Sequence, residues 1–340
     1  MKVSLLVVNY RSAELTNEAV RTARAASRVP LQVVVVDNSA DDAEAARVRD
    51  SDTLIVSKTN RGYAGGINLG RAACTGDVIV ISNPDVTFDA ECIDRLVDAG
   101  ASVSGPALYW DSAYRWHLPP AELVTASEKL DEVLASRARI SAAQRDRRRF
   151  LRRVAFWSLT ETTPVRALSG AVMAVHAADF DAAGGFDERF ALYFEENDFL
   201  RRLAAMRKRI AYVPAARARH LFNQSAGQVA AESAARYAES ELRYLEKWNG
   251  PWLARTMKRL ERPMFQVPPR PAERGEGGRR PGEGSILEAS PLENFNTAAG
   301  CFGCDDLPDE IRTTYRGEVL YLRTVDLATG RVSAQRKMTR

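Results

Sequence analysis

The sequence has 340 residues, of which 45% are hydrophobic and 27% are charged. This composition is typical of a soluble globular enzyme and excludes a wholly disordered or fibrous protein. The formal net charge of +4 is too small to favour nucleic acid or an anionic membrane as the main partner. At roughly 150 residues per domain, the length predicts two domains, or one large domain with an extension.

The start of the chain and its cysteines predict a cytoplasmic protein. Residues 1–8 have the pattern of a strand and not the layout of a signal peptide, and no apolar run approaches the roughly 18 residues of a membrane span. The four cysteines, Cys74, Cys92, Cys301 and Cys304, are too few for a disulfide framework in this length, so we expect them to be reduced. Cys301 and Cys304 have no second pair or nearby histidines, so we do not expect a zinc module.

Short apolar runs alternate with helical segments in the first hundred residues. Ser12 is a candidate cap for a helix over 13–27, and a glycine-rich turn at 60–66 leads into a helix that reaches residue 73. Strands are expected at 3–8, 33–36, 54–56 and 78–81. This alternation predicts a mostly parallel, Rossmann-like sheet with helices on both faces. Asn9, Asp37 and Asp85 fall at the carboxyl ends of strands, where such sheets bind ligands.

The second half begins with a basic helical segment, residues 121–155, which has six arginines between Arg145 and Arg153. A solvated helix face is our first interpretation, and contact with an anionic acceptor or a membrane surface is the alternative. A strand at 171–175, a helix at 196–206, a strand at 210–213 and a helix at 229–247 follow. The last of these helices could pair with its copy in a homodimer.

Residues 267–284 contain four prolines and five glycines and almost no large apolar groups. Such a segment cannot bury enough surface to offset its ordering entropy, so it is expected to be a linker. The expected organisation is therefore a catalytic domain over 1–255, a linker over 256–285 and a small extension over 286–340. The extension is too short to build a sizeable core alone, and residues 318–325 could form one arm of a hairpin that turns at 328–330.

Two segments of the first half could bind a nucleotide. Asp37 could accept a hydrogen bond from a ribose or a base, although Asp37-Asn38-Ser39 also fits an ordinary turn. The glycines between Asn60 and Gly70 could admit phosphates at a helix N-terminus, or they could belong to a common loop. No dinucleotide fingerprint follows the first strand, so a nicotinamide or flavin dehydrogenase is not expected.

Acidic residues at two other places could carry chemistry. Asp85 could bind Mg²⁺ or Mn²⁺, or Asn83-Pro84-Asp85 could be a simple turn. Glu195, Glu196 and Asp198 crowd the start of a helix, where the helix dipole favours them. Their mutual repulsion and the aromatic neighbours would also raise a carboxyl pKa and make a general base. His220 is one of three histidines and is either structural or a ligand.

Taken in order, these segments resemble the inverting family 2 glycosyltransferases of the GT-A fold, in the rhamnosyltransferase-like branch. The resemblance spans roughly residues 3–250 and implies a UDP- or dTDP-linked sugar donor, a bound Mg²⁺ or Mn²⁺, and sugar transfer with inversion. The matching stretches are 7–10, 36–39, 60–70, 83–85, 168–171, 185–202 and 213–220.

The resemblance also implies roles for individual residues. Glu196 is the expected base, with Glu195 as the fallback, because the family's pair is Glu-Asp and Glu196 is one methylene longer. Asp85 and His220 would lie at the metal, and Trp157 and Asp198 would lie near the acceptor. The residues expected at the nucleotide sugar are Asn9, Asp37, Asn60, Gly62, Gly65, Asn68, Asn83, Ser169 and Gly170.

The expected function is metal-dependent transfer of a hexose or deoxyhexose, with rhamnose as one candidate. The acceptor could be a glycan, a lipid-linked glycan or a small natural product, with peripheral contact at the inner membrane face and no nucleic acid partner. One alternative is a catalytically silent nucleotide-sugar-binding or scaffold protein. A sugar nucleotidylyltransferase is the other, but it would need a glycine-rich basic loop after the first strand.

Overall fold

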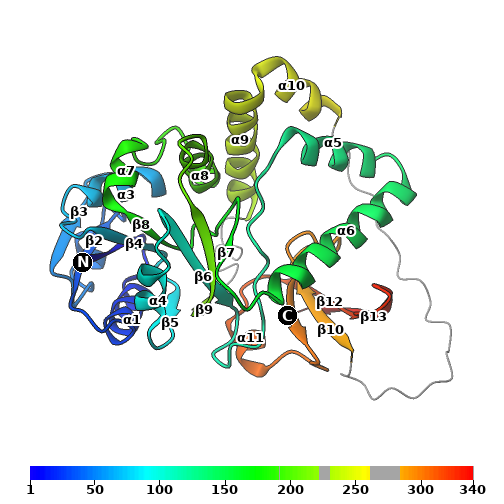
Figure 1. Ribbon diagram of the computed structural model, residues 1–340, viewed down its shortest axis with the longest axis horizontal. Helices are drawn as coiled ribbons and strands as arrows, with labels where there is room; N and C mark the ends of the chain where they lie inside the picture. The colour runs from blue at the N-terminus through cyan, green and yellow to red at the C-terminus, as the bar shows by residue number, and fades with distance from the viewer. Residues whose placement is uncertain (191, 222–229, 261–283, 340) are drawn as a thin grey trace.

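The structure is a computed structural model, and it describes residues 1–190, 192–221, 230–260 and 284–339. A large α/β unit lies at one side, and an arm of helices extends from it towards a second, smaller sheet (Figure 1). Within these described ranges, no helix has the length and apolar character needed to cross a membrane.

The large unit is built around a nine-stranded sheet with the order β3-β2-β1-β4-β8-β6-β9-β5, in which β7 also pairs with β9. Strands β1 to β4, β6 and β9 point the same way, while β5, β7 and β8 run against their neighbours. The strands are β1 Val3–Asn9, β2 Leu31–Asp37, β3 Thr53–Val56, β4 Val78–Ser82, β5 Val86–Phe88, β6 Val103–Tyr109, β7 Thr163–Pro164, β8 Val172–His176 and β9 Ile210–His220.

Helices cover both faces of this sheet because its central strands are apolar on both sides. Every residue of β1 is buried, as parallel strands covered on two faces require. Leu6 and Val8 pack in one core with α3 and α8, while Leu5 and Val7 pack in a second core with α1 and α4. These helices are α1 Ala13–Ala25, α2 Asp42–Ala45, α3 Gly62–Arg71, α4 Cys92–Asp98, α7 Ala177–Ala182 and α8 Glu195–Ala205. The predicted mixed α/β fold with a mostly parallel sheet is confirmed.

The arm consists of four helices, α5 Ala126–Ala135, α6 Arg139–Trp157, α9 Ala230–Asn249 and α10 Pro251–Leu260. Glu241 of α9 forms ion pairs with two of the other helices: its carboxylate lies 2.9 Å from the Lys129 ammonium of α5 and 3.9 Å from the Lys258 ammonium of α10. Tyr244 of α9 is buried against Phe190 and Phe194 of the large unit. The chain itself therefore covers this face of α9, and the expected pairing of the helix with a second copy stays a prediction.

The C-terminal residues form a four-stranded antiparallel sheet, in the order β11-β10-β12-β13, with one short helix. The elements are β10 Ser285–Ser290, β11 Ala299–Phe302, α11 Asp309–Thr314, β12 Val319–Asp326 and β13 Val332–Thr339. The predicted hairpin is present as β12 and β13. This sheet shares its hydrophobic core with the segment after β6. Leu287 and Leu322 of the sheet pack with Trp110, Trp116 and Leu118 of that segment. Residues 261–283 of the expected linker lie outside the described residues.

The arginines of α6 fit the interpretation of a solvated face only in part. The side chain of Arg153 is 2% exposed and binds Glu288 of β10. Arg145 is also buried, and Arg149 lies 2.6 Å from Glu122. Only part of the run faces solvent, where Arg148 and Arg152 form ion pairs with residues of α5. Periodicity alone could not reveal this, because the partner Glu288 is 135 residues away in the sequence.

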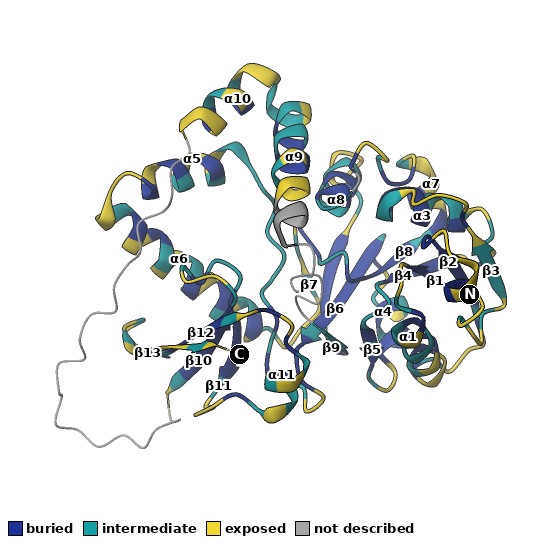
Figure 2. Cartoon of the chain, turned by 180° about the vertical axis from the view of Figure 1, so that it is seen from behind, coloured by how far each residue is buried: buried dark blue, intermediate teal, exposed yellow. Residues whose placement is uncertain are grey.

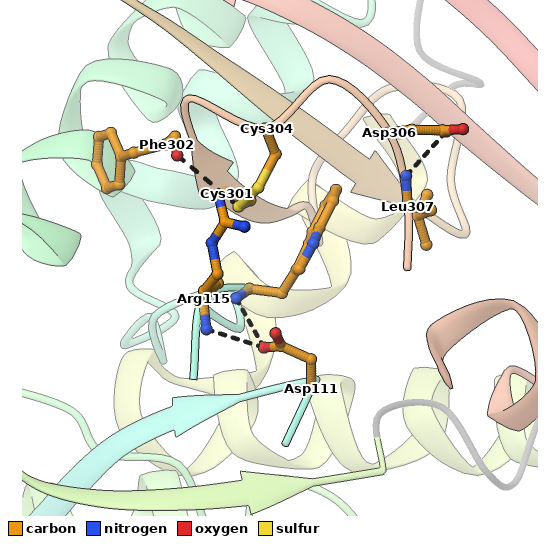
Figure 3. The surroundings of a disulfide bond; sticks show 8 residues. Asp111, Arg115, Cys301, Phe302, Cys304, Asp306 and Leu307 are labelled. Carbon is orange, nitrogen blue, oxygen red and sulfur yellow. Dashed lines mark hydrogen bonds between the residues drawn. A yellow bond between two sulfur atoms is a disulfide. The ribbon is translucent and has the colours of Figure 1, made fainter. Parts of the chain in front are cut away.

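The cysteines also depart from expectation. Cys301 and Cys304 form a disulfide beside Arg115 (Figure 3). The carboxylate of Asp111 accepts hydrogen bonds from the backbone N–H groups of Arg115 and Trp116. Cys74 and Cys92 are free and buried, and burial raises the pKa of the Cys74 thiol to about 11. The prediction that all four cysteines are reduced is therefore wrong for one pair.

Candidate active site

Two glutamates begin helix α8 directly after a strained turn. Tyr193 and Phe194 both have φ of 69°, a left-handed conformation that side chains other than glycine rarely adopt. The turn allows α8 to start at Glu195 while the ring of Phe194 remains buried. Strained backbone of this kind persists where the surrounding structure holds it, often at functional sites. The turn therefore determines where Glu195 and Glu196 lie at the start of α8.

Both glutamates hold their protons more tightly than ordinary carboxyl groups. Burial raises the pKa of Glu195 well above its usual range, and the neighbouring charge of Glu196 raises it further. Burial also raises the pKa of Glu196, although hydrogen bonds from backbone N–H groups and from Asn197 offset part of the effect. Glu195 Oε2 is buried without a hydrogen-bond partner among the described residues. A carboxylate with a raised pKa is a stronger base, so this pair is suited to accept a proton.

Tyr63 and Gly170 connect this pair to the rest of the site. Tyr63 Oη donates to the carbonyl oxygen of Gly170 at 3.3 Å. A side chain at Gly170 would crowd Glu196, because an added Cβ would lie 3.3 Å from its Cγ. Burial raises the pKa of Tyr63 well above its usual range, and the charges of Glu195, Glu196 and Asp85 add to that rise. Tyr63 was not predicted from the sequence as a site residue, although it lies within residues 60–70, the glycine-rich segment predicted to bind a nucleotide.

Asp85 and His220 meet at the edge of the sheet formed by β5 and β9. The strands pair with Val86 opposite His220, which brings His220 Nε2 within 3.3 Å of Asp85 Oδ1. Burial lowers the pKa of His220, but the charge of Asp85 and its hydrogen bond outweigh burial, so the pKa is raised. The two residues that the sequence predicted at a metal are therefore neighbours.

These two side chains fit a divalent cation that is shared with a ligand. A carboxylate oxygen and an imidazole nitrogen are donors that Mn²⁺ accepts, while Mg²⁺ prefers oxygen alone. No group of three or more His, Cys, Asp or Glu side chains able to hold a metal occurs in the described part of the chain. Asp85 and His220 could thus supply only part of a coordination shell, and phosphate oxygens or water would have to supply the remainder.

Asn9 and Asp37 end adjacent parallel strands and bind one another. Asn9 Nδ2 donates to Asp37 Oδ2, and Asn9 Oδ1 accepts from Thr16 Oγ1 at 2.9 Å and from Ser12 Oγ at 3.0 Å. Ser39 also donates to Asp37 through its backbone N–H and its hydroxyl. Both Asn9 and Asp37 are completely buried. Ser12 therefore binds Asn9 and makes no side-chain cap to α1.

Asn38, which sequence reasoning did not select, shapes the loop after β3. Its Nδ2 donates to the carbonyl oxygen of Gly62 at 2.8 Å, and its Oδ1 accepts from the N–H of Arg61. Asn60 Oδ1 accepts from the N–H of Gly62 at 2.9 Å, where φ is 72°. The side chain of Asn60 is exposed, so Asn60 is free to meet a ligand.

Asn68 and the glycines of α3 have structural partners instead of an open ligand face. Asn68 Nδ2 donates to the carbonyl oxygen of Phe186 and to Glu188 Oε1, and Asn68 Oδ1 accepts from the N–H of Phe186. Gly65 is buried, and an added Cβ would lie 3.0 Å from the Cβ of Arg61. Gly66 lies against Val8 of β1 in the same way. Gly65 thus packs against Arg61, and Asn68 binds the loop at Phe186, while the donor roles expected for the two residues stay predictions.

Asn83 and Ser169 lie in two segments that the backbone holds together. The N–H of Asn83 donates to the carbonyl oxygen of Ala171 at 2.9 Å, and Ser169 Oγ accepts from the N–H of Ala171 at 3.3 Å. The Gly170 contacts already described therefore bring Asn83 and Ser169 close to Tyr63 and Glu196. Their expected contact with a donor sugar stays a prediction.

Asp198 and Trp157 do not form an open acceptor surface. Asp198 is completely buried, where it pairs with Arg202 at 2.9 Å and with Lys247 at 2.7 Å and accepts from Trp248 Nε1. Trp157 is 5% exposed, and its Nε1 donates to the carbonyl oxygen of Leu118. Asp198 thus ties α8 to α9, and Trp157 anchors α6 beside the C-terminal sheet. Both polar groups already have partners within the chain, and the expected acceptor roles of the two residues stay predictions.

The chain is similar to known glycosyltransferases. Residues 4–153, which contain β1 to β6, match the family described as Glycosyl transferase family 2. The chain is therefore a glycosyltransferase, and this segment is similar to family 2. The glycosyltransferase is 26% identical over 262 residues to the N-acetylglucosaminyl-diphospho-decaprenol L-rhamnosyltransferase of Mycobacterium tuberculosis, a match that covers 67% of this chain and 79% of that protein. It is 32% identical over 114 residues to the succinoglycan biosynthesis protein ExoO of Rhizobium meliloti, covering 30% and 32% of the two chains.

Solved structures similar to this glycosyltransferase include two that were determined with a nucleotide and Mn²⁺. The mannosyltransferase PcManGT from Pyrobaculum calidifontis, in complex with GDP-Man and Mn²⁺, has a TM-score of 0.47 at 16% identity and covers 76% of this chain and 73% of its own. GalNAc-T7 with UDP, GalNAc and Mn²⁺ has a TM-score of 0.49 at 14% identity and covers 73% of this chain. This chain spans only 48% of the length of GalNAc-T7.

Proposed function

We propose that this glycosyltransferase moves a hexose or deoxyhexose from a UDP- or dTDP-linked donor to an acceptor hydroxyl, by single displacement with inversion and with Glu196 as the general base. The supporting observation is the position of Glu196, which has a raised pKa and packs against Gly170 in a cluster that also contains Tyr63 and Glu195. Glu195 is the fallback base. Its carboxylate is more deeply buried, which favours Glu196 for contact with an incoming hydroxyl.

The chemistry needs a base on one face of the sugar and charge compensation on the other. The anomeric carbon becomes oxocarbenium-like as the nucleoside diphosphate leaves, and a carboxylate on the opposite face removes the proton of the attacking hydroxyl. Asp85 and His220 would hold Mg²⁺ or Mn²⁺, which supplies charge stabilisation to the diphosphate when bound. His220 would bind the metal as the neutral imidazole. Where no metal is bound, its raised pKa favours an imidazolium that faces negative oxygens instead.

Donor recognition is assigned to residues around the carboxyl ends of β1 and β2 and to the neighbouring loops. Asp37 would accept a hydrogen bond from the ribose or the base, with Asn9 holding its carboxylate in place. Asn60 and Gly62 would line the same pocket, shaped by Asn38. The segments that contain Asn83, Ser169 and Gly170 would flank the donor sugar.

The M. tuberculosis relative suggests which sugar and acceptor to try first. Its name specifies transfer of L-rhamnose to N-acetylglucosaminyl-diphospho-decaprenol, so we propose rhamnose and a lipid-linked glycan as the leading pair. A polysaccharide or a small natural product remains an alternative acceptor.

A lipid-linked acceptor implies peripheral contact with the inner membrane face. We assign this contact to α10, much of which is exposed (Figure 2). Its residue Trp252 is 78% exposed, and Arg255 and Arg259 are exposed as well. Exposed aromatic and basic side chains are favoured at membrane interfaces. This assignment replaces the arginine run of α6, whose members largely bind other parts of the chain.

The test is a mass-spectrometric screen of UDP-, dTDP- and GDP-sugars with Mn²⁺, first without and then with lipid-linked acceptors. Wild type is compared with Glu196→Gln and with the matched control Glu161→Gln, which removes an exposed carboxylate that is not among the candidate site residues. Donor turnover that chelator abolishes and only Glu196→Gln greatly reduces is the expected result. Donor binding without turnover would favour a silent binding protein, and pyrophosphate-dependent formation of a nucleoside triphosphate would favour a nucleotidylyltransferase.

A further inference from the structure

A cationic cavity of about 300 Å³ lies apart from the candidate active site. Its volume is at the lower end of the range for small-ligand pockets. It is enclosed by the C-terminal half of α8, the start of β9, the residues after β7 and the segment that leads into α5. The lining residues are Leu123, Thr125, Val165, Arg166, Arg201, Ala204, Arg207, Lys208 and Ile210. Four of these carry a positive charge and none carries a negative charge.

The described residues neutralise only one of these four cations. Lys208 pairs with Asp179 at 2.7 Å. The guanidinium of Arg201 lies 4.4 Å from the ring centroid of Trp248, and it donates to the hydroxyl of Tyr244 at 3.4 Å. These aromatic partners fix the position of Arg201 without cancelling its charge. Within the described chain, neither Arg166 nor Arg207 has an ion-pair partner.

The helix dipole accounts for only part of this charge cluster. Positive side chains near the C-terminus of α8, such as Arg207 and Lys208, are stabilised by the dipole. Arg166 is not on that helix, and Arg201 lies in its middle. The three arginine charges that remain uncompensated around the cavity repel each other unless an anion enters. Guanidinium groups bind phosphate oxygens through two parallel hydrogen bonds.

We propose that this cavity binds a phosphate or diphosphate group. The cavity extends along α8 away from the catalytic carboxylates: at a helical rise of 1.5 Å per residue, Arg201 lies about 8 Å and Arg207 about 16 Å along the chain axis from Glu196. It also lies at the start of β9, while His220 lies at the other end of that strand. The inference goes beyond the proposed function and does not depend on it.

The first experiment is a calorimetric titration with inorganic pyrophosphate in the presence of chelator, so that no metal assists binding at the catalytic centre. The variants are Arg166→Gln, Arg207→Gln and the double variant. The matched control is Arg209→Gln, because Arg209 is an exposed neighbour that does not line the cavity. We expect saturable binding that the double variant weakens at least tenfold and that Arg209→Gln changes less than twofold.

Two results would overturn the proposal. One is the absence of saturable pyrophosphate binding, and the other is an equal effect of Arg209→Gln and Arg166→Gln, which would indicate general electrostatic attraction. His220→Ala provides a second control, because a site in this cavity retains its pyrophosphate affinity when the candidate metal ligand is removed. A melting curve of each variant checks that it is folded.

A second experiment identifies the source of the phosphate. Vesicles of phosphatidylglycerol and of phosphatidylcholine are sedimented with wild type, the double variant and Arg209→Gln. If only phosphatidylglycerol retains the protein, and the double variant alone weakens this retention, the ligand is a lipid headgroup. If the double variant loses pyrophosphate binding but not vesicle binding, the ligand is a soluble phosphate ester. Both results support the cavity as a phosphate site.

Discussion

Arg153 and Glu288 form a completely enclosed ion pair between α6 and β10. Arg153 Nε and Nη2 donate to the same carboxylate oxygen of Glu288 at 2.9 and 2.7 Å, and the two side chains are 2% and 0% exposed. Arg323 donates to the other oxygen at 2.7 Å and also pairs with Asp146 of α6. The C-terminal sheet is therefore fixed to the helical arm by buried charges as well as by apolar contacts.

Removing Glu288 should strongly destabilise the attachment of the C-terminal sheet. Glu288→Ala leaves the buried guanidinium of Arg153 without an ion-pair partner and that of Arg323 with Asp146 alone, and breaking a buried pair in this way costs about 3–5 kcal/mol. The control Arg152→Ala breaks a half-exposed pair with Glu128 and should cost about 1 kcal/mol or less. Urea unfolding followed by tryptophan fluorescence measures both. Equal midpoints for the two variants would contradict the structural role of Glu288.

Glu196→Gln should reduce turnover by roughly 10²–10⁴-fold, the usual contribution of a general base, while donor affinity changes little. The base acts in its ionised form, and its pKa is raised. Activity should therefore increase with pH through a window above the ordinary glutamate pKa of 4.5. A pH–rate profile of the wild type tests this. An acidic limb at or below the ordinary value would assign the base elsewhere.

Glu195→Gln should make the protein more stable at neutral pH. The pKa of Glu195 is raised in the folded state, so its contribution to stability is fully present below pH 4.5 and is lost as pH rises through the folded-state pKa. An isosteric amide cannot ionise and removes this loss, which we expect to raise the free energy of unfolding by about 1 kcal/mol. Thermal melts at several pH values measure the difference. A variant that is less stable than wild type at pH 7 would count against burial of an ionised carboxylate here.

His220→Ala should weaken Mn²⁺ binding, and wild-type affinity should fall as the pH is lowered. A protonated imidazole cannot coordinate a metal, so below the raised pKa of His220 each pH unit should cost about tenfold in affinity. His176→Ala is the matched control, because His176 ends β8 and lies opposite Val78 at the start of β4. Electron paramagnetic resonance of free Mn²⁺ measures both variants. Equal affinities for the two would remove His220 from the metal site.

Asn68→Ala should lower stability, whereas Asn60→Ala should weaken donor binding. Asn68 makes three hydrogen bonds to the loop at Phe186 and Glu188, so its loss should cost about 2 kcal/mol of stability. Asn60 is exposed, and its replacement should instead weaken donor binding. Thermal melts and donor titrations on both variants separate the two effects. Weaker donor binding by a fully stable Asn68→Ala variant would support the donor role expected for Asn68.

The sequence by itself determined the secondary-structure elements whose formation depends on residues close together in the chain. The apolar runs of β1, β2 and β4 and the turn residues after them sufficed to predict the two-sided sheet, because a strand buried on both faces must be apolar throughout. The ordered motifs also indicated the family. Asp85, Glu195 and Glu196 were selected because they follow an expected strand or lie at the start of an expected helix, while the site role of His220 came from the family resemblance.

Only the tertiary structure decided which polar side chains are committed to distant partners. Asn68 binds a loop 118 residues away, Arg153 binds a carboxylate 135 residues away, and Tyr63 reaches Gly170 across 107 residues. Periodicity records which face of an element is apolar, but it cannot show which charge meets which across the folded chain. Burial makes these pairings obligatory, because a polar group removed from water is stable only when another group replaces the water it loses.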